Sequence, residues 1–183
     1  EAFEPARAAA LRAIELDPAL AEGHAALGWI KFWYEWDWPG AEAGLRRGLA
    51  LDPRSAQGHL TLGHAISQMG RHGEALLSTR RARELDPLSL IITALSSQVA
   101  FQARDYRAAL DHATQAIVLD PEFWIGHMMR GQALEQMGDL EAALVAVGER
   151  ARAVVRELAD AHVVEQFLGA VGDGGLLGLE AGR

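Results

Sequence analysis

Residues 49–53 read Leu-Ala-Leu-Asp-Pro, and close variants of this phrase recur along the chain. They stand at residues 14–18 (Ile-Glu-Leu-Asp-Pro), 83–87 (Arg-Glu-Leu-Asp-Pro) and 117–121 (Ile-Val-Leu-Asp-Pro). The four prolines, Pro18, Pro53, Pro87 and Pro121, are therefore 35, 34 and 34 residues apart. A period of this length indicates an array of structural repeats, in which each unit buries its apolar face on its neighbours.

Small residues keep step with these prolines. Glycine lies ten residues beyond three of them, at Gly28, Gly63 and Gly131, and alanine precedes the later prolines by twelve residues, at Ala41, Ala75 and Ala109. Two helices approach closely only where the facing side chains are small. We therefore expect each of these glycines to face an alanine on a partner helix.

Apolar residues at helical spacing predict two helices in each unit. The Asp-Pro pair ends the second helix because the residue before proline avoids the α region, and Gly70 and Gly138 end first helices. No stretch shows sustained strand alternation. The predicted first helices are 19–34, 54–69, 88–102 and 122–137, and the second helices are 5–16, 39–51, 72–85, 105–118 and 140 onward.

The period and the Leu-Gly, Ala and Pro offsets resemble the tetratricopeptide repeat (TPR) over residues 1–150. The resemblance implies an all-α fold, a right-handed α-solenoid of helix-turn-helix repeats. The pattern is broken in several places: Ser96-Ser97 replaces Leu-Gly, one extra residue lies near residues 36–40, and Arg130 and Arg150 occupy repeat positions in the last unit.

The ends of the chain depart from the repeat. Residues 1–16 supply only a second helix, so we expect a truncated first repeat followed by about four repeats within 1–150. Residues 151–168 are amphipathic and are predicted to form a capping helix, followed by a Gly-rich tail to residue 183.

Four stretches also look like the TPR tails of large bacterial signalling proteins: residues 11–18, 34–42, 69–75 and 85–90. Such tails follow winged-helix transcription regulators, class III adenylyl cyclases or serine/threonine kinases. This resemblance implies a cytoplasmic sensory or regulatory arm of a larger protein. A targeting segment upstream of residue 1 stays an open alternative.

Composition excludes several functions. The 183 residues carry a net charge of −8 and contain no cysteine, which argues against disulfide scaffolds, Cys-based metal sites and thiol catalysis. A net-negative chain lacks the basic footprint expected for nucleic acid or anionic membranes. We therefore expect neither nucleic acid nor a membrane as the partner, and the TPR resemblance implies a protein or peptide instead.

No residue pattern predicts catalysis, a cofactor or a metal. His59 and His64 are five residues apart rather than the four of a zinc-binding HExxH motif. His24, His59 and His127 each lie six residues beyond a repeat proline, which favours a structural role. Residues 172–178 nearly match a phosphate-binding glycine loop, but the last glycine is one residue late and the stretch follows a helix.

The TPR resemblance implies that the first helices line a concave groove that receives peptides. This groove is aromatic at one end, rich in amides in the middle and nearly free of charge, so we expect apolar anchors and little effect of salt. A carboxylate clamp of lysine and asparagine is missing, because the chain has no asparagine and only Lys31. The predicted groove residues are Trp29, Phe32, Trp33, Leu60, His64, Gln68, Gln98, Phe101, Gln102, Met128, Gln132 and Glu135.

Alternatives remain at this stage. Trp36 and Trp38 are interpreted as covering the turn beside the extra residue. The chain as a whole is interpreted as a non-catalytic binding scaffold, with a self-association module that forms a homo-oligomer as the main alternative and an enzyme as the least favoured one.

Overall fold

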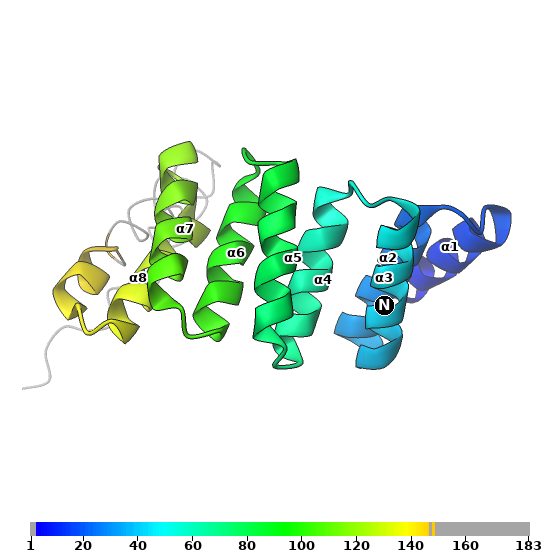
Figure 1. Cartoon of the computed structure of the whole chain (residues 1–183), viewed down its shortest axis with the longest axis horizontal. Helices are drawn as coiled ribbons and strands as arrows, with labels where there is room; N and C mark the ends of the chain where they lie inside the picture. Colours follow the sequence, from blue (N-terminus) through cyan, green and yellow to red (C-terminus); the bar gives the residue numbers. More distant parts are fainter. Residues whose placement is uncertain (1–2, 147, 149–183) are drawn as a thin grey trace, which may run out of the picture.

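The computed structural model describes residues 3–146 and 148. These residues form a row of helices in chain order, with α1 at one end and α8 toward the other (Figure 1). Each helix packs on the next, and α4 and α8 also contact α6. The elements are α1 Phe3–Leu16, α2 Ala21–Ile30, the π-helix η1 Lys31–Glu35, α3 Trp38–Leu51, α4 Ala56–Gln68, α5 His72–Leu85, α6 Leu90–Gln102, α7 Tyr106–Leu119 and α8 Trp124–Gln136. Residues 140–146 are also helical.

The predicted alternation of first and second helices is confirmed. The first helices are α2 with η1, then α4, α6 and α8, and the second helices are α1, α3, α5 and α7, each within a few residues of its predicted bounds. The expected capping helix and Gly-rich tail at 151–183 lie outside the described residues. Within the described residues, no helix is both long and apolar enough to cross a membrane.

The repeated Asp-Pro phrase forms a hydrogen-bonded turn. Asp52 Oδ1 accepts the backbone N–H of Arg54 at 3.0 Å, and Asp17 and Asp120 do the same two residues on. In this Asx-turn the carboxylate replaces a backbone acceptor. Asp17, Asp52 and Asp120 thus form turns at the ends of second helices, where the Asp-Pro pair was expected to end them.

The recurring histidines tie the start of three first helices, α2, α4 and α8, to this turn. His24, His59 and His127 place Nε2 at 3.0, 3.1 and 2.8 Å from the carbonyl oxygen of Pro18, Pro53 and Pro121. A ring N–H that donates to these oxygens satisfies a carbonyl beyond the end of a second helix. The structural role expected of the three histidines is confirmed, and it works through hydrogen bonding.

The glycines of the repeat lie where helices come closest. A Cβ atom on Gly63 would lie 2.8 Å from Thr79 Cγ2 and 3.1 Å from the carbonyl oxygen of Ala75, and one on Gly28 would lie 2.9 Å from the carbonyl oxygen of Ala41. The predicted glycine–alanine contact is therefore confirmed for Gly28 and Gly63. Ser97 takes this position in the third unit and is buried. Its Oγ donates to the Ala109 carbonyl oxygen at 2.7 Å, so the hydroxyl gains a partner at the close crossing.

The extra residue of the first unit lies inside the first helix, which corrects the expected location near residues 36–40. Residues 31–35 form a π-helical turn in which the backbone N–H of Trp36 donates to the Lys31 carbonyl. A π turn spans one more residue than an α turn and so absorbs the insertion. Beyond the π turn the 34-residue spacing of the repeat is restored. The residues that follow the first helices, Trp36, Gly70, Arg104 and Gly138, all have positive φ and are spaced by 34 residues.

Candidate functional site

The predicted groove residues differ widely in exposure. Trp29, Trp33, Gln68, Gln132 and Glu135 are exposed, and Gln98, Phe101, Gln102 and Met128 are half-buried. Phe32, Leu60 and His64 are only 5%, 0% and 5% exposed.

The prediction that Phe32 and Leu60 are available to a ligand is wrong. Phe32 belongs to a core cluster with Leu45 and Ile66. Leu60 packs with Ala82 and Ile92 in a second cluster. Helical spacing assigned both residues to the correct helices, but the adjoining repeat covers them.

Four rings form an aromatic cluster that joins the first unit to the second: Trp29, Phe32, Trp33 and His64. The Trp33 indole stacks on His64 with 5.7 Å between ring centroids, and it meets Phe32 edge-on at 5.1 Å. Trp29 contacts Trp33 edge-on at 5.6 Å. Offset and edge-to-face contacts of this kind stabilise aromatic pairs. The two exposed indoles are thus held in place by the two buried rings.

His64 is a polar group in an apolar site. Within the described residues, neither ring nitrogen of His64 has a hydrogen-bond partner. Burial disfavours the charged imidazolium, and it lowers the pKa of His64 below the usual value of a histidine. The neutral ring is therefore the form that packs against the indoles.

Gln102 is partly committed to the fold. The Ser67 hydroxyl of α4 donates to Gln102 Oε1 at 2.6 Å, and Ser67 Oγ also lies 3.2 Å from His72 Nδ1. This contact ties α4 to α6, so Gln102 offers a ligand only its remaining hydrogen-bonding capacity.

A cavity of about 320 Å³ opens between α2, the end of α3 and the start of α4. Trp29 forms one wall, the small residues Ala25 and Gly48 leave room for the cavity, and the acidic residues Glu22 and Asp52 are part of its lining. Neither acidic residue was predicted at a binding site, because Asp52 belongs to an Asp-Pro pair that ends a second helix and Glu22 lies outside the groove positions. The feature that could have identified them is their position, because both lie at helix ends that adjoin Trp29.

A second cavity, of about 490 Å³, lies between α8 and the helical stretch 140–146. Met128, Gln132 and Glu135 line it, so these three predicted groove residues are brought together. They lie near the opposite end of the row of helices from the aromatic cluster. The twelve predicted residues therefore form no single pocket. They are spread over the successive first helices along the row.

Lys31, the one lysine of the chain, is engaged elsewhere. Its Nζ lies 3.0 Å from Asp37 Oδ2. The Gly40 backbone N–H and Lys31 together lower the pKa of Asp37. This pair closes the π-helical turn and keeps Lys31 out of the groove.

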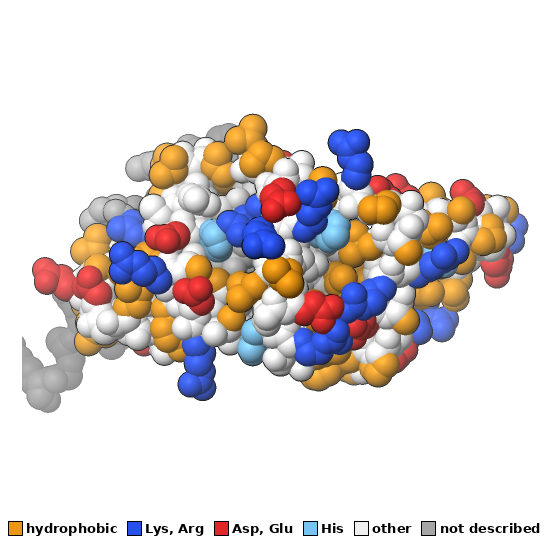
Figure 2. All heavy atoms as spheres, viewed as in Figure 1, with side chains coloured by type: hydrophobic (Ala, Val, Ile, Leu, Met, Phe, Trp, Pro, Cys, Tyr) orange, Lys and Arg blue, Asp and Glu red, His pale blue; other side chains and the backbone are white. Residues whose placement is uncertain are grey.

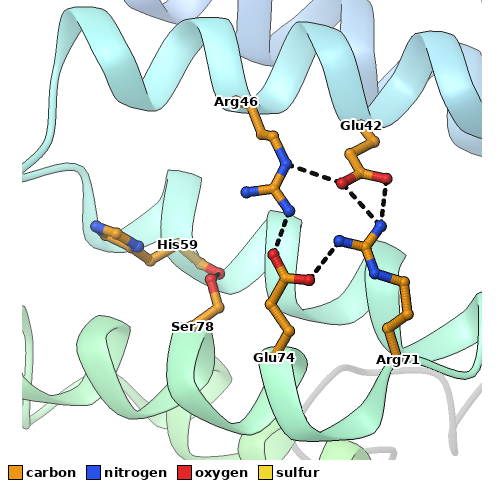
Figure 3. A network of polar contacts seen from close by, with 6 residues as sticks. All are labelled: Glu42, Arg46, His59, Arg71, Glu74 and Ser78. Carbon is orange, nitrogen blue, oxygen red and sulfur yellow. Dashed lines mark hydrogen bonds and ion pairs between the residues drawn. The ribbon is translucent and has the colours of Figure 1, made fainter.

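Four charged side chains form a closed ring: Glu42 and Arg46 on α3, Arg71 just before α5, and Glu74 on α5 (Figure 3). Arg46 Nε lies 2.8 Å from Glu42 Oε1, Arg71 Nη1 lies 2.7 Å from Glu42 Oε2, and both arginines also contact Glu74. Arg71 lowers the pKa of Glu42, and Arg46 lowers that of Glu74. Basic and acidic side chains lie next to one another in this region, between α3 and α5 (Figure 2).

Trp36, which was interpreted as a cover for the turn, is 71% exposed and so is itself little buried there. Trp38, at the start of α3, is 37% exposed. Among residues 3–146 and 148, no group of three or more histidine or acidic residues is arranged to hold a metal ion.

No family model matches the chain, and no curated protein sequence matches it. Solved structures are similar. A crystal structure of MamA has a TM-score of 0.73 at 20% identity, covering 86% of this chain and 91% of that chain. A MamA RS-1 ArsTM double mutant has a TM-score of 0.72 at 15% identity, covering 85% and 86%.

YrrB is a third similar structure, described as a TPR protein with an unusual peptide-binding site. Its TM-score is 0.67 at 17% identity, covering 89% of this chain and 84% of that chain. At such low identities the likeness establishes the fold, and the described part of the chain is therefore an all-α solenoid of TPR type.

Proposed function

We propose that this chain is a non-catalytic scaffold that binds an extended segment of a protein partner along its first helices. The observation that carries the proposal is the pair of exposed indoles, Trp29 and Trp33, fixed by ring contacts on buried Phe32 and His64. Rigid aromatic side chains lose little entropy on binding and are common anchors of protein interfaces. The TPR fold, shared with a structure described as peptide-binding, supports the same proposal.

The contact residues we propose are the accessible members of the predicted groove. Trp29 and Trp33 act as anchors, and Gln68 and Gln98 offer donors and acceptors to a peptide backbone. At the far end, Gln132 and Glu135 lie beside the second cavity. His64 and Phe32 support the anchors from beneath.

The proposal of a non-catalytic role draws on the histidines, the side chains most often used in acid–base catalysis. His24, His59 and His127 hold turn carbonyls through Nε2. His64 is enclosed by aromatic rings, and His112 Nδ1 accepts a hydrogen bond from Arg83 at 3.0 Å. These contacts give each of the five a structural task.

Random peptides displayed on phage and selected on this chain supply the probe for a direct test. We expect a selected peptide to bind the Trp33→Ala variant more weakly by about 2 kcal/mol, as for an interface anchor. The matched control is Trp36→Ala, which removes an exposed indole outside the groove and should leave the affinity unchanged. Peptides with a free or an amidated C-terminus should bind equally.

Loss of binding in Trp36→Ala together with full binding in Trp33→Ala would reject the groove. If the chain self-associates instead, measurements on the same protein variants give a different result. In that case the molar mass in solution rises with protein concentration. Trp33→Ala then lowers the molar mass if a second copy of the chain occupies the groove.

We also propose that the scaffold serves as a regulatory arm of a cytoplasmic bacterial signalling protein. This part rests on the sequence resemblance of residues 11–18, 34–42, 69–75 and 85–90 alone. The full coding sequence tests it. An effector domain on the same polypeptide supports the proposal, and a gene that encodes repeats only rejects it.

A further inference from the structure

The cavity between α2 and α4 combines an aromatic wall with an apolar floor. One side of it is the Trp29 indole, which is 37% exposed. The floor is made of small or aliphatic side chains, among them Ala25, Ala26 and Leu49. A space of this kind accommodates the methylene stem of a long side chain.

The charge at this cavity has one sign. Glu22 and Asp52 line it, and no lysine or arginine does. Within the described residues neither carboxylate forms an ion pair, and Asp52 uses Oδ1 for the Arg54 backbone N–H. Asp52 also ends α3, and the carbonyl end of a helix favours a cation.

The start of α4 faces the same cavity and would by itself favour an anion. Ser55 reduces this attraction, because its Oγ accepts the Gly58 backbone N–H at 3.0 Å. Two carboxylates at the lining then decide the sign of the local field.

Three other cavities of the described residues differ in the charges that line them. The one beside α8 on the first helices is lined by Glu135 and no basic residue. Two cavities lined by residues of both first and second helices contain side chains of both signs, Arg46, Arg81 and Glu74 in one and Arg130 and Asp111 in the other. The cavity between α2 and α4 therefore differs from these two in having carboxylates and no lysine or arginine in its lining.

We propose that the cavity between α2 and α4 binds a basic side chain, preferably arginine, of the partner peptide. The stem lies along the apolar floor, the cation meets the Trp29 face, and the Glu22 and Asp52 carboxylates accept its N–H groups. Arginine is favoured because its planar guanidinium both stacks on an indole and pairs with carboxylates. This inference rests on the proposed peptide-binding function and names one determinant of its specificity.

A cation bound in this cavity changes how the peptide affinity is expected to depend on salt concentration. A groove without charge binds with little dependence on ionic strength, as the sequence suggested. An ion pair at the rim of an open cavity weakens as salt screens it. The affinity for an arginine peptide should therefore fall with added salt, and that for a neutral analogue should not.

The probes are two blocked pentapeptides, acetyl-Ala-Ala-Arg-Ala-Ala-amide and the same peptide with citrulline, the neutral isostere of arginine. Each is titrated into the full chain while the indole N–H signals are followed by NMR, with Trp29 assigned through Trp29→Phe. We expect the arginine peptide to shift the Trp29 signal and to bind about tenfold more tightly than the citrulline peptide, because charged hydrogen bonds exceed neutral ones by that order.

Two variants keep side-chain shape and remove charge. Glu22→Gln and Asp52→Asn should each shrink the preference for arginine, and asparagine keeps the Oδ1 acceptor of the turn. The matched control is Glu84→Gln, which removes a carboxylate that pairs with Arg81 on α5, away from the cavity. It should leave the preference unchanged.

Equal affinities for the two peptides, no shift at Trp29, or an unchanged preference in Glu22→Gln would each overturn the proposal. The two proposals fail separately. If selected peptides depend on Trp33 but arginine and citrulline bind alike, the groove stands and the basic pocket fails. If arginine is preferred through Glu22 but Trp33→Ala has no effect on selected peptides, the pocket stands and the groove fails.

Discussion

Arg104 holds a backbone conformation that glycine holds in the neighbouring repeats. Its φ is +61°, at the position where Gly70 and Gly138 have +79° and +83°. A residue with a Cβ atom in the left-handed region costs about 1–2 kcal/mol relative to glycine. We expect Arg104→Gly to raise the free energy of unfolding in urea by about 1 kcal/mol.

The control for this prediction is Arg104→Ala, which removes the same side chain and keeps the Cβ atom. It should remain at or below the stability of the parent chain. If glycine and alanine at residue 104 are equally stabilising, the side chain and not the backbone conformation is responsible.

A left-handed residue at the end of a first helix could be predicted from the sequence only where that residue is glycine. Gly70 and Gly138 predicted two helix ends, because glycine is the usual signal of a left-handed residue. Arg104 and Trp36 adopt the same conformation without that signal. The turn hydrogen bonds and the packing of the next helix impose it on them.

At the scale of helices, the 34-residue period predicted the order and bounds of the elements well. It could not predict the π-helix at 31–35, because one inserted residue can be absorbed in the helix or in the turn that follows it. The TPR resemblance also placed Phe32 and Leu60 in the groove. Spacing identifies the face of a helix, but the neighbouring repeat determines how deeply that face is buried.

The contact between α2–η1 and α4 should depend on pH through His64. Burial lowers the pKa of His64, and no charged side chain contributes to that shift. Below about pH 6.5, the usual pKa of histidine, the unfolded chain binds a proton that the folded chain does not. The free energy of unfolding should therefore fall as pH falls from 6.5 toward the pKa of the folded state.

Urea unfolding at pH 7.5 and 5.5 measures this dependence, with His64→Phe as the variant that keeps an aromatic ring. The variant should lose less stability over this interval than the parent chain. His112, whose pKa is also lowered, by burial and by Arg83, contributes to both proteins and cancels in the comparison. The carboxylates of Glu42 and Glu74 have lowered pKa values and act only at lower pH. Equal losses in the two proteins would contradict the prediction.

At the scale of the whole molecule, stability is shared between neighbouring helices and has no single centre. Nine of the thirteen residues of α4 are buried, and it packs on α3, α5 and α6, whereas α1 buries only Ala10 of its fourteen and packs on α2. In such a linear array an end helix can detach while the middle stays folded. We expect backbone amides of α4 to exchange with deuterium at least about tenfold more slowly than the most protected amides of α1. Trp29 and Trp33 draw their support from His64 on α4, so the proposed anchors would lie beside the more stable part of the array. Equal protection in α1 and α4 would instead indicate one cooperative unit, in which α1 cannot open before the anchors are lost.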